Sequence, residues 1–168
     1  MNETIEFVVR TLMIGAGATL AMDVWAAVLR RFGVPSLDFA LLGRWIGHLP
    51  RGRWFHDNIR GTPPVRGELL IGWSAHYSIG IAFAALLLAT FGVQWARTPT
   101  LPPALFIGVV TVVAPLFVLQ PALGAGIASS KTSAPVLNSL KSLVTHTVFG
   151  CGLYLAARAS AAILAATP

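Results

Sequence analysis

The sequence predicts an all-α integral membrane protein with four transmembrane helices in two hairpins plus a cytoplasmic amphipathic helix, within a single membrane domain covering residues 1–168. Three observations predict this class. Hydrophobic residues make up 55% of the chain and charged residues only 11%, whereas about a quarter of a soluble domain is charged. Four apolar runs are long enough to cross a bilayer as helices. Most basic residues lie in one connection between those runs, as in cytoplasmic loops.

The first two predicted spans cover residues 5–29 and 69–93. The chain begins with Glu3 and Glu6 where a signal peptide would carry basic residues, so we expect the first span to be retained as a membrane helix. The second span contains no Lys, Arg, Asp or Glu. A short segment with a single arginine follows it and is predicted to be an outer loop.

The last two predicted spans cover residues 102–125 and 140–158. The third starts at two prolines, which suit the first turn of a helix. It also contains Pro115 and Pro121, and because proline removes a backbone donor we expect a kink near Gln120.

The connection over residues 30–68 holds seven of the ten arginines. With the two lysines of the later loop, nine basic residues fall on one side and three on the other. The positive-inside rule therefore predicts that this loop is cytoplasmic, with both termini outside. The same placement explains the net charge of +6, so we expect no nucleic-acid partner. The bilayer and its anionic headgroups are the expected partners.

Within this loop, apolar residues recur at helical spacing over residues 36–48. We expect an amphipathic helix that starts near Ser36 and lies on the inner membrane surface. Trp45, Trp54 and Phe55 are its predicted interfacial anchors.

A short pattern recurs in the second and fourth spans. His76 and His146 are each followed by glycine four residues later, at Gly80 and Gly150. A duplicated helix pair in parallel orientation would produce this repeat. Chance similarity between Gly- and Ala-rich helices is the alternative.

Four polar side chains inside the predicted spans are candidates for binding a ligand or an ion: Asp23, His76, Gln120 and His146. Counted along their helices from the basic boundary, they fall at a similar depth. Ionisable groups inside membranes are costly and mark functional sites by default. If Asp23, His76 and His146 converge, a carboxylate and two imidazoles can bind a divalent metal ion or relay protons. Alternatively, they act as interhelical hydrogen bonds.

A second group of candidates lies in the basic loop: Arg44, His48, Arg51, Arg53 and His56. Most loop arginines are expected to set the topology and contact anionic lipid. The cluster can instead hold an anionic ligand or a partner protein, since arginine pairs readily with phosphate and carboxylate groups.

The chain resembles a family of small four-span bacterial inner-membrane proteins described as a domain of unknown function. The resemblance covers nearly the whole chain. It is carried by GAGATLAMDVWAAVLRRFGVPS, GRWIGHLPRGRWFH, GWSAHYSIGIAFAALL, PLFVLQPALGAGIASSKT and THTVFGCGLYLAA. It implies the four-span fold and the inner-membrane location, and it implies no activity.

Hypotheses about function must therefore be based on the individual candidate residues. The first hypothesis is proton- or metal-ion-handling transport through the Asp23, His76 and His146 layer, which four spans would support more readily in a homodimer. The alternative is a non-catalytic scaffold or assembly factor whose arginine-rich loop binds a partner or anionic lipid. An enzyme is the third hypothesis and the least favoured, because no zinc-protease, nucleophile-elbow or phosphate-loop motif is present.

Overall fold

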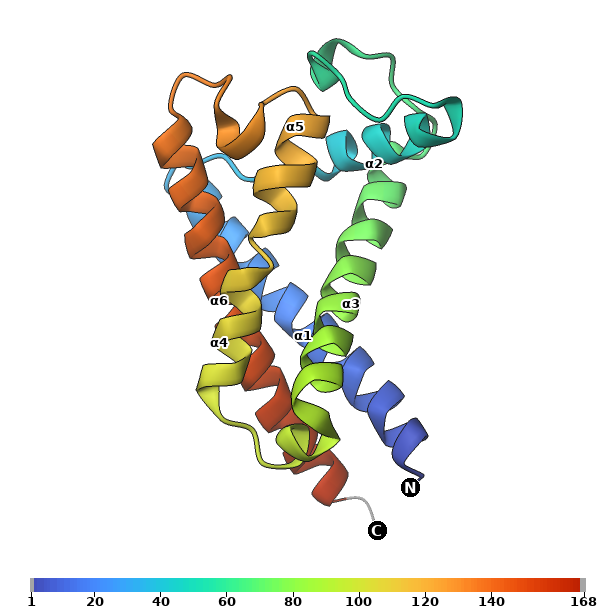
Figure 1. Ribbon diagram of the computed structural model, residues 1–168, viewed down its shortest axis with the longest axis vertical. Helices are drawn as coiled ribbons and strands as arrows, with labels where there is room; N and C mark the ends of the chain where they lie inside the picture. Colours follow the sequence, from blue (N-terminus) through green and yellow to red (C-terminus); the bar gives the residue numbers. More distant parts are fainter. Residues whose placement is uncertain (1, 167–168) are drawn as a thin grey trace. The chain divides into compact units, whose positions relative to one another are not determined.

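The computed structural model describes residues 2–166, and these are helical with no β-strand (Figure 1). The α-helices are α1 (Glu3–Arg31), α2 (Phe39–His48), α3 (Glu68–Arg97), α4 (Leu101–Val110), α5 (Gln120–Ala122) and α6 (Pro135–Ala165). Short 3-10 turns occur at Leu49–Arg51, Ile59–Gly61 and Ile127–Ser129, and a π-helical turn at Pro115–Leu119.

The predicted all-α membrane fold is confirmed. Four helical segments are long and apolar enough to cross a membrane: Glu3–Arg31, Glu68–Arg97, Leu101–Ala122 and Pro135–Ala165. Each overlaps a predicted span. The fourth begins five residues earlier than predicted and ends seven later, because the helix continues past Arg158 through a second, alanine-rich apolar segment.

The chain divides into two compact units, which are described separately. Unit 1 comprises residues 2–34, 77–111 and 145–166, and unit 2 comprises residues 35–76 and 112–144. Unit 1 therefore holds α1, α4 and the C-terminal parts of α3 and α6. Unit 2 holds α2, α5, the basic loop from residue 35 onward, and the N-terminal parts of α3 and α6.

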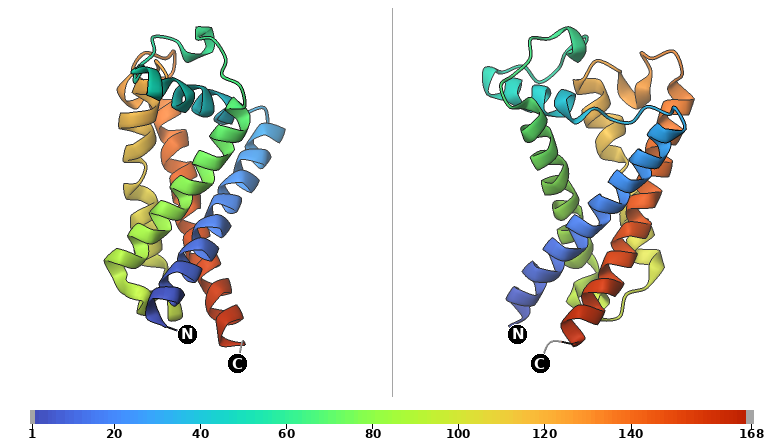
Figure 2. Two further views of the ribbon diagram at one scale, coloured as in Figure 1. Left: turned by 90° about the vertical axis from the view of Figure 1, so that its right-hand side faces the viewer. Right: turned by 180° about the vertical axis from the view of Figure 1, so that it is seen from behind.

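Small residues bring the helices of unit 1 close together. A Cβ at Gly17 would lie 2.8 Å from the Ala156 Cβ, and one at Gly152 would lie 3.0 Å from the Ala18 Cα, so α1 and α6 cross closely here (Figure 2). The repeated glycines also lie at crossings, Gly80 against Thr19 of α1 and Gly150 against α4. Such small-residue faces are typical of membrane helix pairs.

The core of unit 1 is apolar and formed by all four of its helical segments. Its fully buried large side chains are Ile14, Leu87, Leu88, Phe149 and Leu153. Along the outer face of α1, by contrast, large apolar side chains from Ile5 to Val28 are 42–58% exposed. An apolar surface of this kind fits contact with lipid rather than water.

In unit 2, helix α2 begins at Phe39 instead of near Ser36. The Asp38 side chain accepts a hydrogen bond from the Ala40 amide at 3.0 Å, so aspartate rather than serine caps this helix. Leu41 and Leu42 of its apolar face are buried within the protein. The sequence did not indicate this packing, because periodicity identifies an apolar face without saying what covers it.

Glycine explains how α2 packs so closely. A Cβ at Gly43 would collide with the carbonyl of Glu68, and a Cβ at Gly72 would collide with the carbonyl of Phe39. The backbones of α2 and the start of α3 therefore touch, which only glycine permits.

The third span departs from regular helix earlier than the predicted kink at Gln120. Helix α4 ends at Val110, and the π-helical turn follows at Pro115–Leu119. Proline has no amide hydrogen, so Pro115 cannot donate to the carbonyl four residues before it, that of Thr111. The helix is consequently interrupted at that carbonyl, one turn before the proline itself.

Candidate functional site

Asp23 lies on α1 and is partly buried. The hydroxyl of Tyr77, on α3, donates a hydrogen bond to its carboxylate at 2.9 Å. A donor at this distance stabilises a carboxylate in a poorly solvated position. The aspartate that the sequence places inside the first span is therefore bonded to a tyrosine of the second span.

His146 lies on α6, is 8% exposed, and contacts Thr111 after α4, with 3.1 Å between Nδ1 and the hydroxyl oxygen. The same hydroxyl donates to the Gly108 carbonyl at 2.8 Å. A hydroxyl has one proton, and the proton of Thr111 is donated to the Gly108 carbonyl. The imidazole Nδ1–H of His146 therefore donates to the threonine oxygen. This arrangement leaves Nε2 as the nitrogen with a free lone pair.

The other two candidates in the spans belong to unit 2. The ring of His76 lies 4.4 Å from that of Phe39 and 5.9 Å from that of Trp73, measured between centroids. The amide nitrogen of Gln120 donates to the Ser142 hydroxyl at 3.1 Å.

These contacts give each of the four candidates its own set of neighbours. Among residues 2–166, no group of three or more His, Cys, Asp or Glu side chains is arranged to hold a metal ion. A metal site of Asp23, His76 and His146 stays a prediction, with Asp23 and His146 placed in unit 1 and His76 in unit 2.

In the basic loop, Arg44 is engaged within unit 2. Its guanidinium donates to both carboxylate oxygens of Glu68, at 2.8 and 2.9 Å, and to the Thr62 carbonyl at 3.1 Å. The hydrogen bonds that Arg44 donates to Glu68 raise the pKa of Arg44 above its ordinary value. The two parallel hydrogen bonds to one carboxylate have the bidentate geometry that arginine favours. They connect α2 to Glu68, where the basic loop ends.

Arg51 and Arg53 are exposed, unlike Arg44. They adjoin two large aromatic side chains, Trp54 and Phe55, which are 60% and 74% exposed. The loop backbone beneath them is ordered by the Trp45 indole, which donates to the Trp54 carbonyl at 2.9 Å. We call Arg51, Arg53, Trp54 and Phe55 the arginine–aromatic surface.

His48 and His56 lie closer to the interior of the loop. His48 is 2% exposed and His56 is half-buried, and their ring centroids are 5.6 Å apart. The loop that carries His56 is fixed by backbone hydrogen bonds to the end of the third span, at Ala122 and Leu123.

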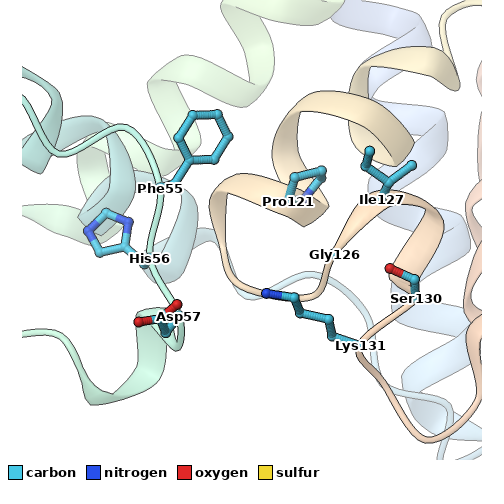
Figure 3. Close-up of a pocket in the computed structure, with 8 residues that line it drawn as sticks. All are labelled: Phe55, His56, Asp57, Pro121, Gly126, Ile127, Ser130 and Lys131. Carbon is cyan, nitrogen blue, oxygen red and sulfur yellow. The ribbon is translucent and has the colours of Figure 1, made fainter.

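A pocket of about 450 Å³ opens beside this loop (Figure 3). Phe55, His56 and Asp57 line one side, and the lysine Lys131 extends toward them from the opposite side. The remaining lining residues are Pro121, Gly126, Ile127 and Ser130. Its size suits a small ligand, and half of its lining residues are polar or charged: His56, Asp57, Ser130 and Lys131.

The sequence analysis did not identify a buried ion cluster at the start of α1. Glu6 accepts from Arg10 at 2.8 Å and from Arg97 of α3 at 2.6 Å. Arg10 also donates to the Ala96 carbonyl at 3.0 Å and to the Ser160 hydroxyl at 3.4 Å. The four-residue spacing of Glu6 and Arg10 could have indicated their ion pair from the sequence. Nothing in the sequence indicated that Arg97 would join it.

Comparison with known proteins gives one match. Searches of characterised proteins and of solved structures found nothing similar to the chain. A family model described as a protein of unknown function, DUF2938, matches residues 12–160. That range includes Asp23, His76 and His146 and the whole basic loop. The chain, with four helices long and apolar enough to span a membrane, belongs to the DUF2938 family.

Proposed function

We propose that this chain is a non-catalytic membrane protein whose arginine–aromatic surface binds anionic phospholipid headgroups. The observation that carries the proposal is the contrast among the loop arginines. Arg44 is used inside the fold, while Arg51 and Arg53 are exposed beside Trp54 and Phe55. Exposed arginines with adjacent aromatic rings suit the headgroup region, where the cation meets phosphate and the ring enters the apolar boundary.

The proposal includes an orientation. The basic loop faces the cytoplasm in a bacterial inner membrane, with both termini outside, because anionic lipid in the inner leaflet attracts basic segments. The aromatic pair then lies at the membrane boundary, and the ordered loop presents both arginines to the headgroups.

The experiment measures binding of short-chain phosphatidylglycerol to the purified full chain in neutral detergent. Each arginine near an anionic surface contributes about 1 kcal/mol, so Arg51→Gln with Arg53→Gln should weaken binding by roughly 30-fold at low salt. The matched control is Arg60→Gln with Arg66→Gln, which removes two exposed arginines from the same loop without neighbouring aromatics. Equal weakening by both pairs, or equal binding of phosphatidylcholine, would refute the specific surface.

Ion handling is the second candidate, favoured by the hydrogen bond between Asp23 and Tyr77 inside a span. Here the chain conducts protons or metal ions, with Asp23, His76 and His146 as the titrating or liganding groups, in a homodimer. The test is ion flux into liposomes containing the full chain. Asp23→Asn should abolish the flux and Glu3→Gln should not, and flux that is insensitive to Asp23 would exclude this role.

A further inference from the structure

The histidine pair in the basic loop has a hydrogen-bonding pattern that no lipid-binding role explains. His48 ends α2, and His56 lies between the two 3-10 turns of the loop. Their rings face each other edge to face, 5.6 Å apart and inclined by 66°.

Each ring has one nitrogen next to a backbone carbonyl. His48 Nε2 is 3.0 Å from the Pro63 oxygen, and His56 Nδ1 is at the longer distance of 3.4 Å from the Ala122 oxygen. A carbonyl oxygen only accepts hydrogen bonds, so each of these nitrogens carries the proton. In the neutral rings, His48 Nδ1 and His56 Nε2 are then unprotonated and present lone pairs.

These two nitrogens are buried, and neither has a hydrogen-bond partner among residues 2–166. A buried polar atom without a partner costs free energy, and a bound ion or a water molecule would satisfy it. Metal-binding histidines have this arrangement, in which one nitrogen donates to a carbonyl and the other coordinates the ion.

We propose that His48 Nδ1 and His56 Nε2 bind a transition-metal ion of the class that prefers imidazole, such as Zn²⁺, Cu²⁺ or Ni²⁺. An ion about 2.0–2.1 Å from each nitrogen lies about 3 Å from each ring centre. Two rings that share it are thus at most about 6 Å apart, and the observed 5.6 Å fits. The remaining positions on the ion stay open to water or to a ligand.

The site is held in place before any ion arrives. The His56 amide donates to the Ala122 carbonyl at 3.0 Å, and the Ile59 amide donates to the Leu123 carbonyl at 3.3 Å. Gly124, with φ of 95°, allows this loop to approach, because a Cβ there would lie 2.7 Å from the His56 carbonyl oxygen. Little ordering is therefore needed when the ion binds.

The test uses the untagged, chelator-treated full chain in detergent, titrated calorimetrically with Zn²⁺ and Cu²⁺. We expect one ion per chain, with Cu²⁺ bound more tightly than Zn²⁺. Electron paramagnetic resonance of the Cu²⁺ form should show coupling to two imidazole nitrogens. His56→Gln should weaken binding by at least about tenfold, since losing even an outer-shell partner costs about 10–100-fold.

Arg60→Gln is the matched control, because it changes an exposed side chain of the same loop outside the histidine pair, and it should leave binding unchanged. His48 is almost fully buried, so His48→Gln is interpreted only if its thermal unfolding matches that of the parent. The spectrum of the unmodified protein and the His56→Gln titration decide the question without it. Absence of saturable binding, a spectrum without two nitrogens, or equal weakening of binding by Arg60→Gln and His56→Gln would overturn the site.

Discussion

Replacing Glu6 with glutamine should strongly destabilise unit 1. The carboxylate accepts from two guanidinium groups, and the side chains of Glu6 and Arg10 are only 9% and 6% exposed. Glutamine keeps the shape and removes the charge. Arg10 would then be a buried cation bonded only to neutral oxygens, those of the glutamine, Ala96 and Ser160.

The expected magnitude follows from this geometry. Removing one partner of a buried ion pair costs about 3–5 kcal/mol, because the other charge remains buried without compensation. We expect the lower end, about 3 kcal/mol, since the glutamine oxygen can still accept a hydrogen bond. Arg97 adds little to this cost because its side chain is 47% exposed and stays hydrated.

The assay is unfolding of the purified chain in mixed micelles with increasing dodecyl sulfate, followed by circular dichroism. Glu3→Gln is the control, because Glu3 lies in the same first turn of α1 and is exposed. Glu6→Leu combined with Arg10→Met should be less destabilising than Glu6→Gln alone, since an apolar pair leaves no buried charge. If the free energy of unfolding of Glu6→Gln lies within about 1 kcal/mol of that of Glu3→Gln, the cluster does not stabilise the fold as a buried ion pair would.

Three further predictions concern helix packing, the Arg44–Glu68 ion pair and the membrane topology. Gly108→Val should cost about 1–3 kcal/mol in the same unfolding assay, because a Cβ there would lie 2.5 Å from the Gly150 Cα; an unchanged midpoint would contradict this close crossing. Arg44→Lys should destabilise the loop by about 1.5–3 kcal/mol, because an ammonium cannot form the paired bonds to Glu68, and limited proteolysis should detect faster cleavage than in the parent. A cysteine replacing Arg53, in a chain whose native cysteine is alanine, should resist an impermeant thiol reagent added outside cells, whereas strong labelling would reverse the predicted orientation.

The sequence alone determined where the helices are. A run of about 20 apolar residues can satisfy its backbone in lipid only as a helix, so composition and length identify the spans without knowledge of their partners. All four predicted spans are therefore confirmed, with errors limited to their ends and to the position of the break before Pro115. Asp23 and His146 could be singled out in the same way, because a polar residue within an apolar run can be recognised from the sequence alone.

The partners of these residues were decided only by the tertiary structure. Asp23 bonds to Tyr77, 54 positions away, and Glu6 bonds to Arg97, 91 positions away. The rotation of each helix about its axis selects these pairs. That rotation depends on which glycines allow backbones to touch, as Gly43 and Gly72 do in unit 2. Periodicity shows that a face exists, but the neighbour of that face is set by packing among segments far apart in the chain.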